Sequence, residues 1–203
     1  MFNLYPYQSK TKITEACQLL EEYRLGERNF SQVNLVKASL TDVKLTNANF
    51  WGASFSETNL SHSVLRGSNL EECSLEGATL WRTDLSRGKL RQANFRNALM
   101  ICANLTQTNL FKALLSDAEM RLVSLVEANL SQADLSGANL SYADLSYASL
   151  QGANLKGTIL TGARLAHADL TDTNLNQAIL FGADLSQAIL SKSKADCRIL
   201  LDD

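Results

Sequence analysis

Residues 133–140 read Ala-Asp-Leu-Ser-Gly-Ala-Asn-Leu, and this five-residue pattern runs through most of the chain. Every fifth residue from Phe30 to Leu190 is Leu, Phe or Met, without one insertion. The residue two places before each of these is small, most often Ala, with Arg28 as the exception. A strict short period indicates one structural unit copied many times, in which each copy buries its apolar side chains against its neighbours. The sequence therefore predicts a solenoid.

The internal order of each unit predicts its conformation. Residues two apart point to the same side of an extended chain, so the small and the large residue of a unit share one interior. The residue between them, mostly Asn or Asp, faces outward. The other two positions favour Ser or Thr and then Gly, as in Ser136-Gly137, which is typical of turns. Each unit is therefore expected to be a short extended piece followed by a corner.

These units resemble the pentapeptide-repeat family, whose pattern is Ala, Asp or Asn, Leu and two freer positions. The resemblance implies an all-β solenoid, a right-handed quadrilateral β-helix of about eight coils with four five-residue repeats per coil. We expect an N-terminal leader with a capping α-helix at 1–27, the pentapeptide-repeat β-helix at 28–192 and a C-terminal tail or cap at 193–203.

The distribution of charges supports a coil of twenty residues. Between Phe30 and Leu190, this spacing stacks no like charges and five opposite pairs. The pairs are Lys37 with Glu57, Glu71 with Arg91, Glu76 with Arg96, and Arg164 with both Asp144 and Asp184. Spacings of fifteen or twenty-five would stack four or five like-charged pairs. Because stacked like charges are unfavourable, a coil of four units suits this sequence best.

A solenoid has two open ends, each with backbone edges that need cover. Residues 11–25 have the pattern of an amphipathic helix, and Gly26 is placed to end it. The apolar residues at helical spacing are Ile13, Ala16, Cys17 and Leu20. We expect this helix to cover the first coil near Phe30 and Phe50.

The pattern decays after Lys192 into an apolar tail. With Ile189, the tail residues Ile199, Leu200 and Leu201 are a candidate dimerisation end. Two alternatives stay open: the tail covers the last coil of its own chain, or it pairs with its copy in a homodimer.

Composition is that of one water-soluble domain, with a net charge of −2, 45% apolar residues and one proline. No apolar run is long enough to span a membrane, and the first residues do not read as a secretion signal. We therefore expect a cytoplasmic protein. We also expect a bacterial one, because the uninterrupted repeat resembles family members of unknown role that are common in cyanobacteria. The four cysteines then fit as reduced thiols.

Residues for catalysis are scarce. His62 and His167 fall on different sides, about five coils apart, and no Cys or His cluster has metal-ligand spacing. The outward aspartates fill the slot that Asn fills in other units. We therefore expect no catalytic, cofactor-binding or metal site, and no enzyme.

Charge also bears on the function best known in the family. Some members resemble DNA and bind type II topoisomerases, which protects bacteria from quinolone-type inhibitors. Residues 30–190 hold fourteen acidic and twelve basic residues, whereas imitation of a phosphate backbone needs a sustained negative field. A gyrase-protecting DNA mimic is therefore the alternative. Direct nucleic-acid binding is not expected, because the basic cluster lies on all four sides of one coil. Its members are Arg82, Arg87, Lys89, Arg91 and Arg96.

One side of the expected coil carries more outward apolar residues than the other three. The apolar face comprises Trp81, Leu99, Ile101, Leu122, Tyr142, Ile159, Ile179 and Phe181. An exposed apolar stripe indicates a contact surface for a protein partner or for a second copy. Alternatively, the first ten residues cover it, with Phe2, Leu4, Tyr5 and Tyr7 as plugs. The sequence thus predicts a non-catalytic scaffold or protein-binding module of unknown biological role.

Overall fold

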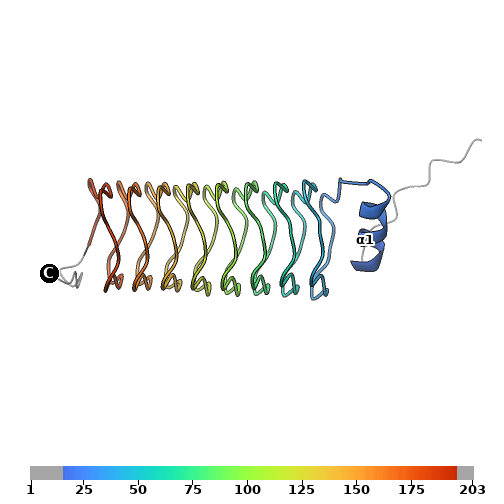
Figure 1. The fold of residues 1–203 in the computed structure, drawn as a ribbon, viewed down its shortest axis with the longest axis horizontal. Helices are drawn as coiled ribbons and strands as arrows, with labels where there is room; N and C mark the ends of the chain where they lie inside the picture. The colour runs from blue at the N-terminus through green and yellow to red at the C-terminus, as the bar shows by residue number, and fades with distance from the viewer. Residues whose placement is uncertain (1–15, 196–203) are drawn as a thin grey trace, which may run out of the picture.

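A computed structural model of the chain describes residues 16–195. Figure 1 shows a rod of stacked coils with one helix, α1 (Ala16–Arg24), at the N-terminal end. With nine residues, α1 is too short to cross a membrane, and residues 16–195 contain no other helix.

The rod is a parallel β-helix with a coil of twenty residues. Parallel bridges join residues twenty apart, beginning with Asn29 and Asn49 and continuing to Asn174 and Lys194. Each extended piece contributes a single bridge residue, so residues 16–195 contain bridges rather than longer strands. Four bridges succeed one another at five-residue steps before the chain returns above its starting point. The predicted spacing is therefore confirmed.

A residue in the left-handed backbone conformation forms each corner. The second residue after every large inward residue has a positive φ, such as 61° at His62, 57° at Leu122 and 69° at Gly137. The next residue closes the turn with a backbone hydrogen bond, as Thr58 N does to Phe55 O at 3.0 Å. Glycine adopts this conformation at no steric cost, but other residues hold most of the corners. The packed coils on both sides of a corner stabilise this otherwise unfavourable conformation.

The interior of the rod is a column of Leu, Phe, Met and Ala side chains that are buried along nearly its whole length. Phe30 stacks on Phe50, with ring centroids 5.6 Å apart. Hydroxyls that replace Ala in the interior are paired with backbone: Thr58 Oγ1 donates to Leu35 O at 2.6 Å. Each inward side chain is therefore apolar or hydrogen-bonded, and no buried side-chain N or O of the described residues lacks a partner.

The helix α1 covers the first coil. Leu19 is fully buried, and the Tyr23 ring lies 6.4 Å from the ring of Phe30. The Tyr23 hydroxyl also donates to Thr46 O at 3.0 Å. Gly26, with φ of 101°, ends the helix, and its N–H donates to Tyr23 O at 3.1 Å.

The predicted helix face was partly wrong. Cys17 is exposed, and Leu19 takes the buried place, with Ala16, Leu20 and Tyr23 partly buried around it. The helical spacing from Ala16 runs through positions 19, 20 and 23, so Cys17 turns away from the rod. Ile13 lies outside the described residues, as do Phe2, Leu4, Tyr5 and Tyr7.

Side chains form ladders between coils at two spacings. At twenty residues, Asn69 Nδ2 donates to Asn49 Oδ1 at 3.1 Å, and Lys37 pairs with Glu57 at 3.5 Å. At eighteen residues, the residue that directly follows a large inward residue reaches the outward residue of the next coil, as Arg66 does to Asp84 at 2.7 Å. The predicted charge pairs include no contact at this second spacing.

Candidate functional site

The apolar face is built by one side of the β-helix. Leu99, Ile159 and Ile179 occupy bridge positions on one ladder, which also contains Thr79, Glu119 and Asn139. Trp81, Ile101 and Phe181 each follow the large inward residue of a unit on this same side, and Leu122 and Tyr142 occupy its corners. The coil therefore places all eight predicted residues along one side.

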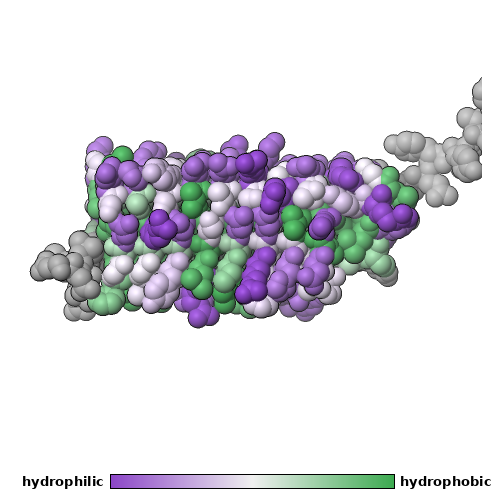
Figure 2. Space-filling model, in the orientation of Figure 1, coloured by the Kyte–Doolittle hydropathy of each residue, from purple (hydrophilic) through white to green (hydrophobic). Residues whose placement is uncertain are grey.

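Trp81, Leu99 and Ile101 surround a shallow hollow of about 360 Å³. Ser61 and Thr79 complete its lining, and we call it the Trp81 hollow. Trp81 is 42% exposed and Leu99 45% exposed, so both side chains offer a large apolar area to solvent. In Figure 2, the hydrophobic surface on the visible side of the rod forms separate patches among polar residues.

The rim of the Trp81 hollow is polar and cationic. The His62 ring meets the Trp81 ring edge-on, with centroids 4.7 Å apart. The guanidinium carbon of Arg82 lies 4.9 Å from the centroid of the same ring. These contacts hold the indole in place and set a positive charge beside it.

Polar residues interrupt the apolar face at its middle. Arg121 pairs with Glu119 at 3.3 Å, and Asn139 Nδ2 donates to Glu119 Oε2 at 3.3 Å. On the C-terminal side of this polar group, Ile179 and Phe181 are again about half exposed. On the bridge ladder, Glu119 and Asn139 therefore separate Leu99 from Ile159, whereas Leu122 and Tyr142 lie at the corners beside them.

The corner residues of the apolar face are its most exposed members. Leu122 is 57% exposed and Tyr142 63% exposed. The Tyr142 ring lies against Gly162 in the next coil, where an added Cβ would lie 2.6 Å from Tyr142 Cε1. Gly162 therefore provides the space that this ring occupies.

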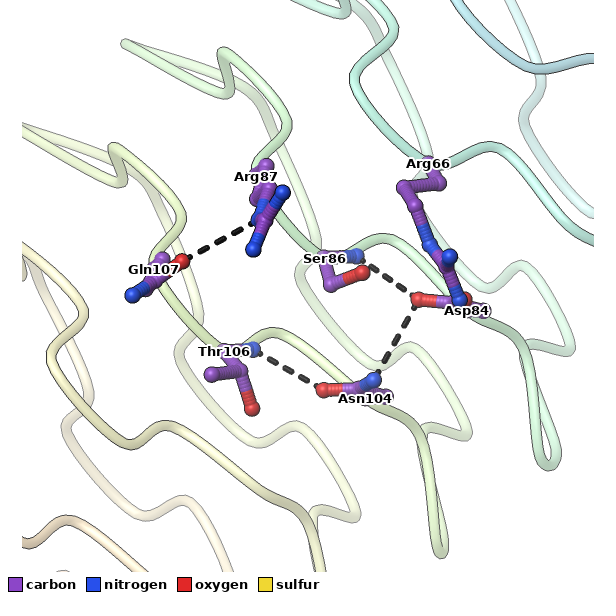
Figure 3. A network of polar contacts seen from close by, with 7 residues as sticks. All are labelled: Arg66, Asp84, Ser86, Arg87, Asn104, Thr106 and Gln107. Atoms are coloured by element: carbon purple, nitrogen blue, oxygen red, sulfur yellow. Dashed lines mark hydrogen bonds and ion pairs between the residues drawn. The ribbon is translucent and has the colours of Figure 1, made fainter.

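A second hollow, of about 370 Å³, lies in the same part of the rod (Figure 3). Its lining is polar and consists of Arg66, Ser86, Arg87, Asn104, Thr106 and Gln107. Beside it, Ser86 N–H donates to Asp84 Oδ1 at 3.0 Å, and Asn104 Nδ2 donates to the same oxygen at 3.3 Å. Burial would raise the pKa of Asp84, but the hydrogen bonds from Ser86 and the Arg66 guanidinium outweigh it and hold the pKa below its ordinary value.

In the described part of the chain, the two histidines lie apart from each other. His167 stacks on Tyr147, with centroids 4.6 Å apart, whereas His62 contacts Trp81. Within residues 16–195, no three His, Cys, Asp or Glu side chains are grouped so that they could hold a metal ion. Cys73 is buried in the interior column.

The candidate dimerisation end is only partly described. Ile189 is 53% exposed and Leu190 43% exposed in the last coil. Ile199, Leu200 and Leu201 lie outside the described residues.

Sequence reasoning had predicted the members of the apolar face. It missed the contact of His62 with Trp81 and the polar hollow beside Arg87. The signal for the first was present, since His62 precedes Trp81 by nineteen residues, close to one coil.

Comparisons with known proteins concern the repeat region. The model of the family "Pentapeptide repeats" matches eight copies, at residues 29–61, 53–92, 82–117, 124–162 and 158–194. No curated protein sequence matches the chain significantly. Among solved structures, HetL is 33% identical, with 90% of this chain and 97% of that chain covered and a TM-score of 0.42. It is described as a pentapeptide repeat protein involved in heterocyst differentiation regulation, from the cyanobacterium Nostoc sp. strain PCC 7120.

Two further solved structures are similar over a large part of their length. A trypsin-treated form of QnrB1, a plasmid-mediated fluoroquinolone resistance protein, is 20% identical, with 84% of this chain and 91% of that chain covered and a TM-score of 0.47. Another pentapeptide repeat protein from Nostoc PCC 7120 is 32% identical, with 55% of this chain and 84% of that chain covered and a TM-score of 0.31. Because the family model covers most of the residues from 29 to 194, the chain belongs to the pentapeptide-repeat family.

Proposed function

We propose that this protein is a rigid, non-catalytic binding module of about eight coils, whose apolar face contacts a protein partner or a second copy of the chain. The observation that carries the proposal is the Trp81 hollow, where Trp81 and Leu99 are each more than 40% exposed. Exposed apolar clusters with a polar rim are typical of protein contact surfaces. Membership of a family made largely of structural and binding modules supports the same function.

The rod suits this task because its surface and its core are separate. The inward positions of the repeat hold the buried apolar and small residues, whereas the outward positions hold different residue types from unit to unit. Bridges run from Asn29 to Lys194 and join every coil to the next, so the face is held in a fixed geometry. A preorganised surface loses little conformational entropy when a partner binds.

Replacing apolar residues of this face with charged ones tests the proposal. We expect the double variant Ile101→Asp, Leu122→Asp to keep its circular dichroism spectrum and to lose association, measured by analytical ultracentrifugation for self-contact and by affinity capture for a foreign partner. Val126→Asp is the matched control, because Val126 occupies the same position of its unit as Ile101, on the adjacent side. If the double variant associates as the unchanged protein does, the apolar face is not the interface.

The alternative function is that of a DNA-mimicking modulator of a type II topoisomerase. The charge distribution favours the binding module over this alternative, because the coil at 80–99 carries five basic residues and one acidic residue. This positively charged coil interrupts the negative field that DNA mimicry requires.

A further inference from the structure

The coil that forms the Trp81 hollow is also the most basic coil of the rod. Residues 80–99 include five Lys or Arg and a single Asp. The preceding coil, 60–79, has one Arg and three Glu, and the following coil, 100–119, has one Lys, one Asp and one Glu. We call the five cations the cationic belt: Arg82, Arg87, Lys89, Arg91 and Arg96.

Three arginines of the cationic belt lie against neutral groups. Arg82 lies over the Trp81 ring, and Arg91 lies 5.4 Å from the centroid of Phe111. Arg87 Nε donates to Gln107 Oε1 at 3.2 Å (Figure 3). In the part of the chain that the structure describes, no belt residue forms an ion pair, and all five are exposed.

The one acid of the same coil does not neutralise the belt. Asp84 pairs with Arg66 from the preceding coil, at 2.7 Å. Arg82 and Arg87 therefore present positive charge beside an exposed apolar hollow. Because charged residues at an interface rim select partners of the opposite sign, the surface is complementary to acidic protein.

We propose that the Trp81 hollow and the cationic belt form one binding site for an acidic protein segment. A large apolar side chain of the segment enters the hollow between Trp81, Leu99 and Ile101. Carboxylates on either side of it then pair with Arg82 and with Arg87, which lies one unit further along the coil. This inference rests on the proposed function, since it gives the chemistry of the partner that the apolar face takes.

A nucleic acid fits the same surface less well. Lys89 and Arg91 lie on one side of the coil, whereas Arg82, Arg87 and Arg96 belong to three other units. The belt therefore surrounds the rod within a single coil, about 5 Å thick along the axis. A straight phosphate backbone would meet only one or two of these cations, and it offers no exposed apolar side chain for the hollow.

Selection from a random library tests the chemistry of the partner. Phage that display random twelve-residue peptides are selected on the immobilised full chain, and enriched peptides are synthesised with a fluorescent label. Their affinity is measured by fluorescence anisotropy for the unchanged protein, for Ile101→Asp, for Arg82→Glu and for Lys156→Glu. Lys156 is the matched control, because it is an exposed cation outside the belt. A 20-base-pair DNA duplex is measured in parallel.

We expect enriched peptides to combine Asp or Glu with a large apolar residue. Their affinity should fall about tenfold or more in Arg82→Glu and in Ile101→Asp, and less than about twofold in Lys156→Glu. Peptides that need Ile101 but carry no excess of acidic residues would overturn the inference and leave the proposed function standing. A library that yields no Ile101-dependent peptide would overturn both. Binding of the DNA duplex through Arg82, without such peptides, would also overturn the inference.

Discussion

The thiol of Cys73 donates a hydrogen bond to the backbone carbonyl of Phe50 in the preceding coil, at 2.8 Å. Cys73 occupies a small inward position that is Ala in most units, and its side chain is 1% exposed. Burial raises the pKa of this thiol to about 12, because the apolar column disfavours the thiolate. The interior therefore keeps Cys73 neutral at any physiological pH.

This shift predicts a loss of stability at high pH. The unfolded chain releases the Cys73 proton near pH 9, whereas the native chain retains it up to about pH 12. Between these values the unfolded state binds fewer protons, so the free energy of unfolding falls as pH rises. At pH 10.5 we expect a loss of ~2 kcal/mol from this thiol, because one pKa unit corresponds to about 1.4 kcal/mol.

The variant Cys73→Ala isolates the effect. Its free energy of unfolding, measured in urea at pH 8 and at pH 10.5, should fall less than that of the unchanged protein, since all other titrating groups are shared. Equal falls in the two proteins would show that the thiol ionises in the native state as easily as in the unfolded one.

The contact between Tyr142 and Gly162 predicts a difference between two similar substitutions. Gly162 and Gly157 have nearly the same φ, 64° and 67°, so alanine meets the same backbone cost at both. Only at Gly162 would the new Cβ reach the Tyr142 ring, at 2.6 Å, whereas nothing lies within 4 Å at Gly157. We expect Gly162→Ala to lower the unfolding free energy by ~1 kcal/mol more than Gly157→Ala does.

A double-mutant cycle identifies the cause of that difference. With Tyr142→Ser in place, Gly162→Ala should cost no more than Gly157→Ala, because the ring is gone. Chemical denaturation of the four proteins gives the coupling energy. A coupling near zero would place the cost in the backbone rather than in the ring.

Much of the fold was predictable, because the repeat provides two independent signals. The five-residue period fixed the inward positions, and the charge pairs selected the twenty-residue coil that the bridges confirm. Lys37 with Glu57 and Arg164 with Asp144 form the expected ion pairs, at 3.5 and 3.6 Å. Because each coil contacts only its neighbours and the repeat has no insertion, distant parts of the chain have little influence on the fold.

Other pairs were wrong, because a side chain that directly follows a large inward residue has more than one neighbour in the adjacent coils. Glu76 accepts a hydrogen bond from Asn94, eighteen residues away, rather than pairing with Arg96. Arg91 lies over Phe111 rather than pairing with Glu71. Exposed ion pairs are worth little, so small differences in reach decide between such partners. For this reason the surroundings of the Trp81 hollow could not be derived from a single spacing.

The packing of α1 on the first coil predicts how the N-terminal end unfolds. Leu19 is fully buried against the first coil, whereas Cys17 of the same helix is exposed. Leu19→Asp removes ~2 kcal/mol of apolar burial and brings a charge to the interface, so α1 should detach. Hydrogen exchange followed by mass spectrometry should then be faster in residues 29–50 and unchanged near Leu130. Cys17→Asp, the control, should leave both regions as they were, and faster exchange in it would assign the effect to the helix itself.

The charge pattern predicts the outcome of a supercoiling assay with purified DNA gyrase. A DNA duplex carries one negative charge per ~1.7 Å of its axis, and a mimic must reproduce that field along its length. This chain has a net charge of −2, and the coil at 80–99 is positive. We therefore expect added protein, up to micromolar levels, neither to inhibit supercoiling nor to protect gyrase from a fluoroquinolone. A short DNA duplex as competitor provides the positive control for inhibition. Protection by the rod would establish the topoisomerase function and would overturn the argument from charge.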